Sequence, residues 1–309
     1  SVFSESVTSL KPDAKKSPLY GVLTSGGEAA QFDRFVPKEA TSFSSGSGIS
    51  LKKLYHYIRE FVTKTEPGGD QHLALFDRIQ RENWELDIEK DILDLFEGPM
   101  ISIEMNTDWV FLLKVTSEKA AQARIQDLIA RINAAMGKEG GLMITPADVA
   151  EGVSFTQVTH PMMMLMGGLQ PVIGAAEGHL ILGSNVKAVR RCLETAQGKH
   201  ANITKNKRWS REGLKPTKGQ KVDSISYTDE SRTAEEWQAA IGMMSMVMGF
   251  AWMGMQAAPP QAQAMIQALP PILAKLAPVV GKMDFFQSSA EVKTVDGSQW
   301  ITRSVQNYK

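Results

Sequence analysis

Residues 100–115 read MISIEMNTDWVFLLKV. Apolar and polar residues alternate on both sides of Asn106-Thr107-Asp108, and alternation with a period of two is typical of strands. A short break that contains Asn and Asp between two such runs is typical of a hairpin turn. The stretch therefore predicts two antiparallel strands, Met100 to Met105 and Trp109 to Val115.

Helical spacing of apolar residues flanks this hairpin. Upstream, six residues at intervals of three and four predict a helix with one buried stripe, and they are Leu51, Leu54, Tyr55, Ile58, Phe61 and Val62. Residues 86–98 predict a further helix, with Asp87 as its N-cap. Downstream, a helical pattern runs from Ser117 to Gly137. Strands are predicted around 142–144, 153–159 and 172–182, the last split by Glu177-Gly178-His179, and a helix is predicted over 185–196.

Near the end of the chain, Asp296-Gly297 predicts a turn between strands at 284–294 and 298–306. A strand, two helical segments and a strand hairpin follow one another both here and in residues 41–115. This order predicts an internal repeat that rests on element order and not on residue identity. The fold class that we predict is α+β, a mainly antiparallel sheet with helices packed on one face.

The composition changes along the chain and predicts four parts. Residues 1–31 are an extended arm with one edge strand, 32–198 a first α+β unit, 199–221 a basic connection, and 222–309 a second α+β unit that contains an apolar helical hairpin. This division is compatible with one continuous sheet shared by the two units. Lys plus Arg equals Asp plus Glu at 34 each, so no global charge would attract nucleic acid, and none is expected as a partner.

The apolar hairpin contains the most unusual stretch, Ala239 to Ala258, which reads AAIGMMSMVMGFAWMGMQAA. It has no charge and six methionines, and twenty helical residues would cover about 30 Å, the thickness of a bilayer. Pro259-Pro260 ends it, and neither end carries Lys or Arg, which argues against a membrane span. A buried helix inside the α+β unit is one interpretation, because methionine fills irregular gaps well.

A surface that docks a protein partner or a lipid is the second interpretation, since methionine-rich faces adapt to different partners. A second methionine cluster, in the loop after His160, would join this surface. The predicted contact residues are Met162, Met163, Met164, Met166, Met243, Met246, Met248, Phe250, Trp252, Met253 and Met255. Copper(I) is a further alternative because thioethers suit that ion, although residues two apart on a helix point away from each other.

The basic connection holds eight Lys or Arg against the single acid Glu212. A contact with an anionic surface is predicted for five of its residues, Lys205, Lys207, Arg208, Trp209 and Arg211. A solvated connection is the simpler interpretation of the same run.

No pattern of catalytic residues is present. The phosphate-binding Gly-x4-Gly-Lys-[Ser/Thr] run and the Gly-x-Ser-x-Gly elbow are both absent, and the five histidines lack paired ligand spacing. Cys192, the single cysteine, lies in a helical pattern and is expected to be a buried packing residue. We therefore predict no enzyme, no catalytic residue, no cofactor and no metal ligand.

A set of segments spread over roughly residues 32 to 307 includes Val36-Pro37, Leu51 to Val62, Leu86 to Phe96, Gly178 to Asn185 and Tyr227-Thr228-Asp229. Together these segments resemble a family of bacterial proteins that is common in planctomycete-type bacteria, domain of unknown function 3352. The resemblance implies a protein that is exported to the periplasm or the cell surface, some relatives having a membrane anchor. It supplies no catalytic residue.

These observations predict a non-catalytic binding or structural domain, a subunit or interaction module of a larger assembly. Its partner would be a protein or a second copy of the chain, contacted through the methionine-rich hairpin. The alternative is a carrier of a lipid or other apolar ligand, whose cavity would lie between the sheet and the hairpin.

Overall fold

The computed structural model describes residues 1–11, 13, 16–23, 32–47, 50–136, 143–150, 152–159, 170–212, 214, 221–232, 241, 275, 278, 286–296 and 299–308. Contacts divide the chain into two compact units. Unit 1 consists of residues 1–4, 227–290 and 304–309, and unit 2 of residues 5–226 and 291–303. The division predicted from the sequence stays a prediction.

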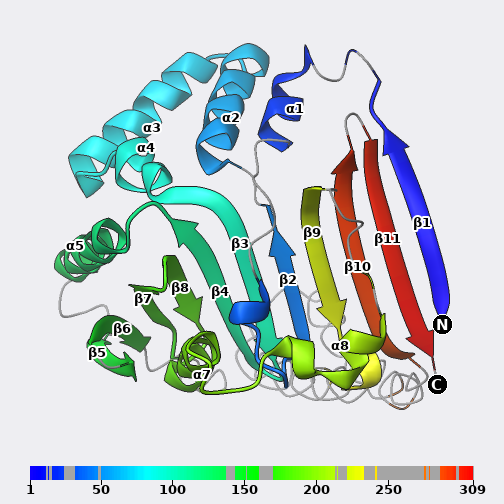
Figure 1. The fold of residues 1–309 in the computed structure, drawn as a ribbon. Coiled ribbons are helices and arrows are strands. Elements are labelled where there is room, and N and C mark those ends of the chain that lie inside the picture. The colour runs from blue at the N-terminus through cyan, green and yellow to red at the C-terminus, as the bar shows by residue number, and fades with distance from the viewer. Residues whose placement is uncertain are drawn as a thin grey trace. The chain divides into compact units, whose positions relative to one another are not determined.

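The described residues form one antiparallel sheet of eleven strands, to which unit 2 contributes residues from every strand. In chain order the strands are β1 (Val2–Ser9), β2 (Ser42–Gly46), β3 (Phe96–Met105), β4 (Asp108–Val115), β5 (Met143–Ala150), β6 (Val153–Thr159), β7 (Val172–Ala176), β8 (His179–Gly183), β9 (Lys221–Thr228), β10 (Phe286–Asp296) and β11 (Gln299–Tyr308). Their spatial order is β1-β11-β10-β9-β2-β3-β4-β8-β7-β6-β5 (Figure 1). The predicted α+β class with a mainly antiparallel sheet is thus confirmed.

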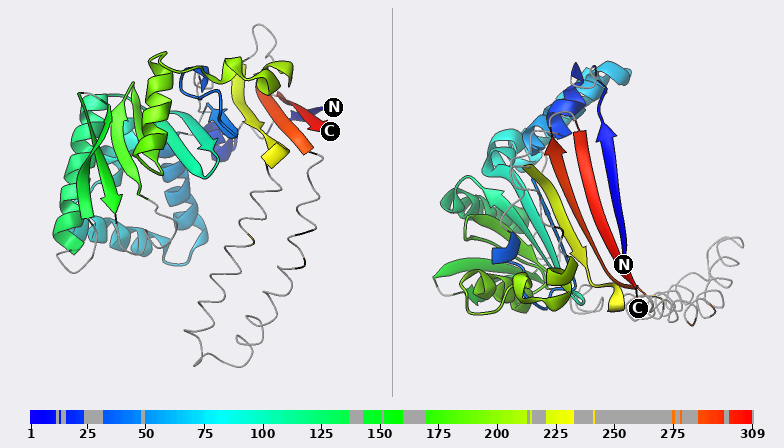
Figure 2. Two further views of the ribbon diagram at one scale, coloured as in Figure 1. Left: turned by 90° about the horizontal axis from the view of Figure 1, so that it is seen from below. Right: turned by 45° about the vertical axis from the view of Figure 1, so that its right-hand side comes forward.

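The α-helices bear the labels α1 (Pro18–Leu23), α2 (Leu51–Thr65), α3 (Gly69–Trp84), α4 (Ile88–Asp91), α5 (Glu118–Met136), α7 (Val186–Ala196) and α8 (Lys207–Glu212). Short 3₁₀ turns are η2 (Phe32–Arg34), η3 (Leu93–Leu95), η4 (Ile203–Lys205) and η5 (Glu230–Arg232). Figure 1 shows α2 and α3 side by side beyond the ends of β2 and β3. Figure 2 shows β10, β11 and β1 as neighbouring strands, in agreement with the sheet order.

The middle of the sheet buries one of its faces completely. In antiparallel pairs, directly opposite residues lie on the same face. Phe43 lies opposite Ile103, and Ile103 opposite Val110. All three side chains are at most 1% exposed. This surface, which we call the first face, therefore forms the core of unit 2.

Helix α7 covers the first face. Asn185 caps the helix, because its side-chain oxygen accepts a hydrogen bond of 2.9 Å from the N–H of Ala188. Gly183 lies opposite Val110, and a Cβ atom on Gly183 would lie only 2.3 Å from Cγ2 of Val189. Glycine therefore lets α7 approach β8. Cys192 on α7 is fully buried, which confirms the packing role expected of it, and burial raises the pKa of its thiol to about 12.

Helix α5 covers the other side of the sheet, the second face, at β7 and β8. Ala175 lies opposite Leu180, and Ala175 forms a buried cluster with Val115 and with Ala121 and Ile125 of α5. Helices therefore lie on both faces, and the prediction of one covered face is wrong. The reason is that β7 and β8 carry apolar residues at nearly every position, so both of their faces must be covered.

The helix predicted over 86–98 also differs from the structure. Asp87 does cap a helix, but α4 ends at Asp91, and β3 begins at Phe96. Phe96 pairs with Val115, and the strand then bulges before Met100. Gly98 lies in this bulge with a φ of +108°, a backbone conformation that favours glycine. Of the apolar residues at the end of the predicted helix, Phe96 thus belongs to the sheet, whereas Leu93 and Leu95 lie in the 3₁₀ turn η3.

Candidate functional site

An apolar cleft lies on the second face of β2, β3 and β4, beside the first turn of α2. Its volume is about 240 Å³, and its apolar lining residues are Leu51, Leu54, Phe96, Pro99, Met100 and Leu113. Ser44, Gly46 and Ser102 add small residues from the strands. The cleft is open to solvent at two of these residues, because Leu51 is 38% and Met100 is 45% exposed.

Local structure explains why the cleft forms. Ser50 caps α2, because its Oγ accepts a hydrogen bond of 3.2 Å from the N–H of Lys53. The helix therefore begins at Leu51, and its first turn places Leu51 and Leu54 at the cleft. Across the cleft from these residues, β3 has a bulge between Phe96 and Met100, and a bulge bends the strand that contains it. The cleft is thus bounded by a capped helix on one side and a bulged strand on the other.

The apolar stripe of α2 continues from the cleft along the helix and is exposed. Leu51, Ile58 and Phe61 are 38%, 49% and 53% exposed, and no residue of α2 is buried. The predicted buried stripe is therefore wrong. Arg59 binds Asp77 of α3, and Arg59 lies about 100° around the helix from Ile58. Helix α3 therefore packs beside the stripe, and although α1 also lies beside α2, the side chains of Leu51, Ile58 and Phe61 stay exposed.

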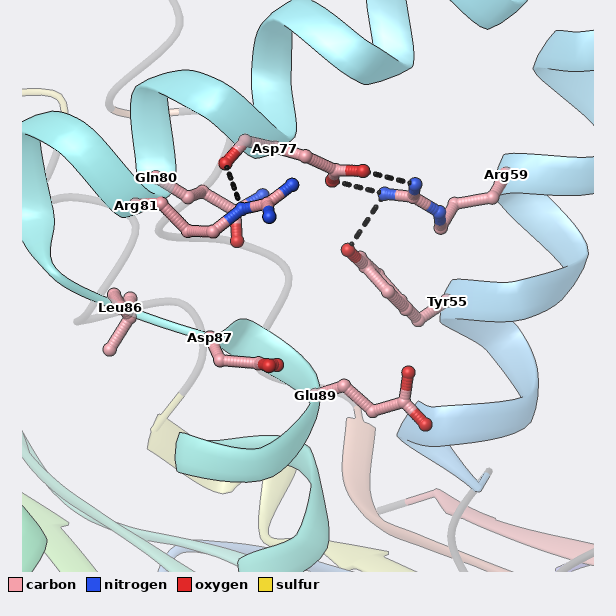
Figure 3. Close-up of a pocket in the computed structure, with 8 residues that line it drawn as sticks. All are labelled: Tyr55, Arg59, Asp77, Gln80, Arg81, Leu86, Asp87 and Glu89. Carbon is pink, nitrogen blue, oxygen red and sulfur yellow. Dashed lines mark hydrogen bonds and ion pairs between the residues drawn. The ribbon is translucent and has the colours of Figure 1, made fainter.

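A second, polar pocket of about 240 Å³ lies between α2, α3 and α4 (Figure 3). Eight residues line it: Tyr55 and Arg59 from α2, Asp77, Gln80 and Arg81 from α3, and Leu86, Asp87 and Glu89 from the segment that enters α4. We call it the polar pocket. Figure 3 shows the hydroxyl of Tyr55 pointing toward the middle of this group of side chains.

Arg59 and Asp77 neutralise each other at the rim of the polar pocket. Two hydrogen bonds of 2.7 Å join the guanidinium nitrogens of Arg59 to the two carboxylate oxygens of Asp77. Arg59 also donates to the hydroxyl oxygen of Tyr55 at 3.0 Å. The hydrogen bonds from Arg59 lower the pKa of Asp77 below its ordinary value and raise the pKa of Arg59. Both groups therefore stay charged at neutral pH.

The side chains of Gln80 and Arg81 have N–H groups for which the described residues supply no acceptor. Gln80 is 3% exposed, and its buried Nε2 has no hydrogen-bond partner among the described residues. Arg81 donates from Nε to the carbonyl oxygen of Asp77 at 3.2 Å. Within the described part of the chain, no carboxylate forms an ion pair with Arg81.

Asp87 and Glu89 place carboxylates on the α4 side of the polar pocket. Asp87 accepts a hydrogen bond of 3.1 Å from the N–H of Lys90, and this contact lowers the pKa of its carboxyl group. Glu89 lies 3.1 Å from Nζ of Lys52 and 3.2 Å from Nε2 of His56. Both carboxylates remain accessible to solvent.

The methionine-rich contact residues predicted from the sequence, from Met162 to Met166 and from Met243 to Met255, lie outside the described residues. Of the basic connection, Lys205, Lys207 and Arg208 are exposed, and Arg211 lies in α8. Trp209 is half-buried, and its ring packs edge-on against Phe32 and Phe43 at 5.9 and 5.2 Å. The indole therefore has a packing role beside any contact with an anionic surface.

Neither the cleft nor the polar pocket was predicted from the sequence as a site. The amphipathic pattern of α2 was recognised, but such a pattern does not show which element covers it. The polar pocket combines residues from three helices, and a pattern of neighbouring residues does not show how three helices pack together. Within the described ranges, no three His, Cys, Asp or Glu side chains are grouped to hold a metal ion, and no helix is long and apolar enough to cross a membrane.

Comparisons with protein-family models, with curated proteins and with solved structures found no match for this chain. A function is therefore inferred from the residues themselves.

Proposed function

We propose that this chain is a non-catalytic binding domain that uses the apolar stripe of α2 to contact a protein partner. The main evidence is that Leu51, Ile58 and Phe61, on one side of an otherwise polar helix, are 38–53% exposed. Contiguous apolar surface of this kind is covered in most soluble proteins, and where it is not, it marks an interaction site. Helix-in-groove recognition uses the same spacing of three and four residues.

The cleft at the start of α2 would receive one apolar side chain of the partner. Its volume of about 240 Å³ is below the roughly 300 to 1,000 Å³ of clefts that take drug-sized ligands. Binding energy in protein interfaces concentrates in pockets that bury one large anchor residue. The size of the cleft therefore favours a protein interface over a carrier of a whole lipid, which stays the second candidate because the lining is apolar.

The remaining predictions from the sequence stay proposals, and each rests on the sequence observation from which it was made. The methionine-rich hairpin as a second contact surface, copper(I) binding there, and contact of the basic connection with an anionic surface rest on the sequence pattern. The internal repeat rests on element order. Family membership and a periplasmic or cell-surface location rest on the resemblance stated above.

Photo-crosslinking in cells that produce the protein naturally tests the proposal. Ile58 is replaced by the photo-reactive residue p-benzoylphenylalanine, and Glu60, about 160° around the helix, is replaced in the control. We expect an adduct with a protein, either another chain or a second copy, from position 58 and not from position 60. A lipid adduct would favour the carrier instead. No adduct from position 58 would contradict both functions.

A further inference from the structure

The polar pocket contains a donor that the fold has buried without an acceptor. Leaving a buried amide N–H unpaired is costly, so native proteins keep such groups rarely and mostly for a purpose. Nε2 of Gln80 is such a group, on a side chain that is 97% buried and lines the pocket. A ligand that supplies an acceptor oxygen would give this N–H group a hydrogen-bond partner.

Arg81 indicates the charge of that acceptor. Its guanidinium lies next to Gln80 on the α3 side of the pocket (Figure 3). Asp77, four residues before Arg81 on the same helix, is already engaged by two hydrogen bonds from Arg59. A guanidinium binds carboxylates through its forked donors more strongly than it binds neutral oxygens. A carboxylate on the ligand would therefore satisfy Gln80 and Arg81 together.

The opposite side of the pocket is lined by two carboxylates. Nζ of Lys52 lies 3.1 Å from Glu89 and Nζ of Lys90 lies 3.5 Å from Asp87. Each carboxylate is partly exposed and has further acceptor positions for a positively charged donor. Asp87 and Glu89 lie across from Gln80 and Arg81 in Figure 3. A ligand with only negative charge would face these two carboxylates, and a ligand with only positive charge would face Arg81. One that carries both charges meets a complementary group on each side. The apolar side chain of Leu86 and the Tyr55 ring would contact the part between them.

We propose that the polar pocket binds a small zwitterion of the free α-amino acid class, with its carboxylate at Gln80 and Arg81 and its ammonium group at Asp87 and Glu89. The volume of about 240 Å³ admits a molecule of this size. The proposal does not depend on the exposed stripe residues Leu51, Ile58 and Phe61, because none of them lines the polar pocket.

Ligand-observed NMR titration of the full chain tests the proposal with defined probes. L-Alanine and L-phenylalanine carry both charges, N-acetyl-L-alanine lacks the ammonium group, and L-alaninamide lacks the carboxylate. We expect saturable binding of the two amino acids and at least about tenfold weaker binding of both analogues, since a hydrogen bond to a charged group contributes about 1.5 to 3 kcal/mol. Equal binding of either analogue, or no binding of either amino acid, would overturn the proposal.

Variants of the pocket separate recognition from folding. Gln80→Met keeps the length of the side chain and removes the amide, so we expect a higher Tm together with at least about tenfold weaker binding. Asp87→Asn keeps a good helix cap and removes the charge, so it should weaken binding without unfolding α4. Arg81→Gln should weaken binding, whereas Arg78→Gln, on an exposed position of the same helix, should not. Unchanged affinity in Gln80→Met and Asp87→Asn would show that the amino acid does not bind in the polar pocket and would overturn the proposal.

Discussion

Arg59 of α2 and Asp77 of α3 form a two-point ion pair, with both nitrogen-to-oxygen distances at 2.7 Å. The pair lies on one flank of α2 and holds α3 there. The apolar stripe, which faces a different direction, is consequently left open beside the cleft. The ion pair is one of several contacts that hold α3 on this flank of α2, and Thr63 also donates a hydrogen bond of 2.9 Å to Asp70.

Asp77→Asn tests the contribution of this ion pair to stability. The two side chains are less than a third exposed, and we expect the free energy of unfolding at pH 7 to fall by about 1 kcal/mol. Urea unfolding of Asp77→Asn, Arg59→Gln and the double variant gives the coupling energy, which should be of the same size. A coupling near zero would mean that the pair does not hold the helices together.

The same pair predicts a pH dependence. Because the folded pKa of Asp77 lies below the ordinary value of 3.8, the folded state favours the ionised carboxylate. The stabilisation is complete above the unfolded pKa and is lost as the pH falls through the folded pKa. Wild type and Asp77→Asn should therefore differ in stability at pH 6 and converge in strong acid. A difference that stays constant down to pH 2 would contradict this.

Substitutions in the α2 stripe should affect binding without affecting folding. Ile58→Gln and Phe61→Gln replace half-exposed side chains, so each should change the free energy of unfolding by no more than about 0.5 kcal/mol. Ile103→Ala, in the core, should cost about 2 to 5 kcal/mol. Chemical denaturation measures both. A loss above about 2 kcal/mol for Ile58→Gln would mean that the chain itself covers the stripe.

Gly183 is predicted to be required for the packing of α7 on the first face. Gly183→Ala would place a Cβ atom 2.3 Å from Cγ2 of Val189, and overpacking of this kind costs about 1 to 3 kcal/mol. Val189→Ala removes the clashing methyl groups, so the double variant should lose less stability than the sum of the two single variants. Thermal unfolding of the three variants is the measurement, and strict additivity would argue against the contact.

His179 predicts a loss of stability on mild acidification. Burial lowers the pKa of this histidine below its ordinary value of 6.5, and the charges of Lys114 and Arg34 act in the same direction. Its Nδ1–H donates to the carbonyl oxygen of Glu177 at 2.7 Å, and this hydrogen bond is the largest contribution that raises the pKa, but burial outweighs it. The unfolded chain therefore takes up a proton more readily than the folded one, and stability falls as the pH drops below 6.5.

His179→Gln should reduce that loss of stability between pH 7 and pH 5. His72→Gln, at an exposed position on α3, is the matched control and should leave the pH profile as it is in the wild type. Urea midpoints across this range make the comparison. Identical profiles for wild type and His179→Gln would show that the histidine is not the titrating group.

Local patterns in the sequence predicted the hairpins well, because strand alternation and turn residues are properties of neighbouring positions. The turn between β7 and β8 is an example, since Glu177 and Gly178 have φ values of +54° and +75°. Contacts between distant elements were not predictable in the same way. The covering of both sheet faces, the open side of α2 and the polar pocket each depend on where α3, α5 and α7 pack, which periodicity alone does not determine.

The exposure of α2 in the isolated chain is the most direct test of the proposed binding function. Hydroxyl-radical footprinting reports the accessibility of individual side chains, with Leu51, Ile58 and Phe61 compared with the buried Ile103 and Leu112 as internal references. We predict rapid modification of the three stripe residues in the isolated chain and protection in the native assembly. Protection of all three in the isolated chain, to the level of Ile103, would contradict the proposed function.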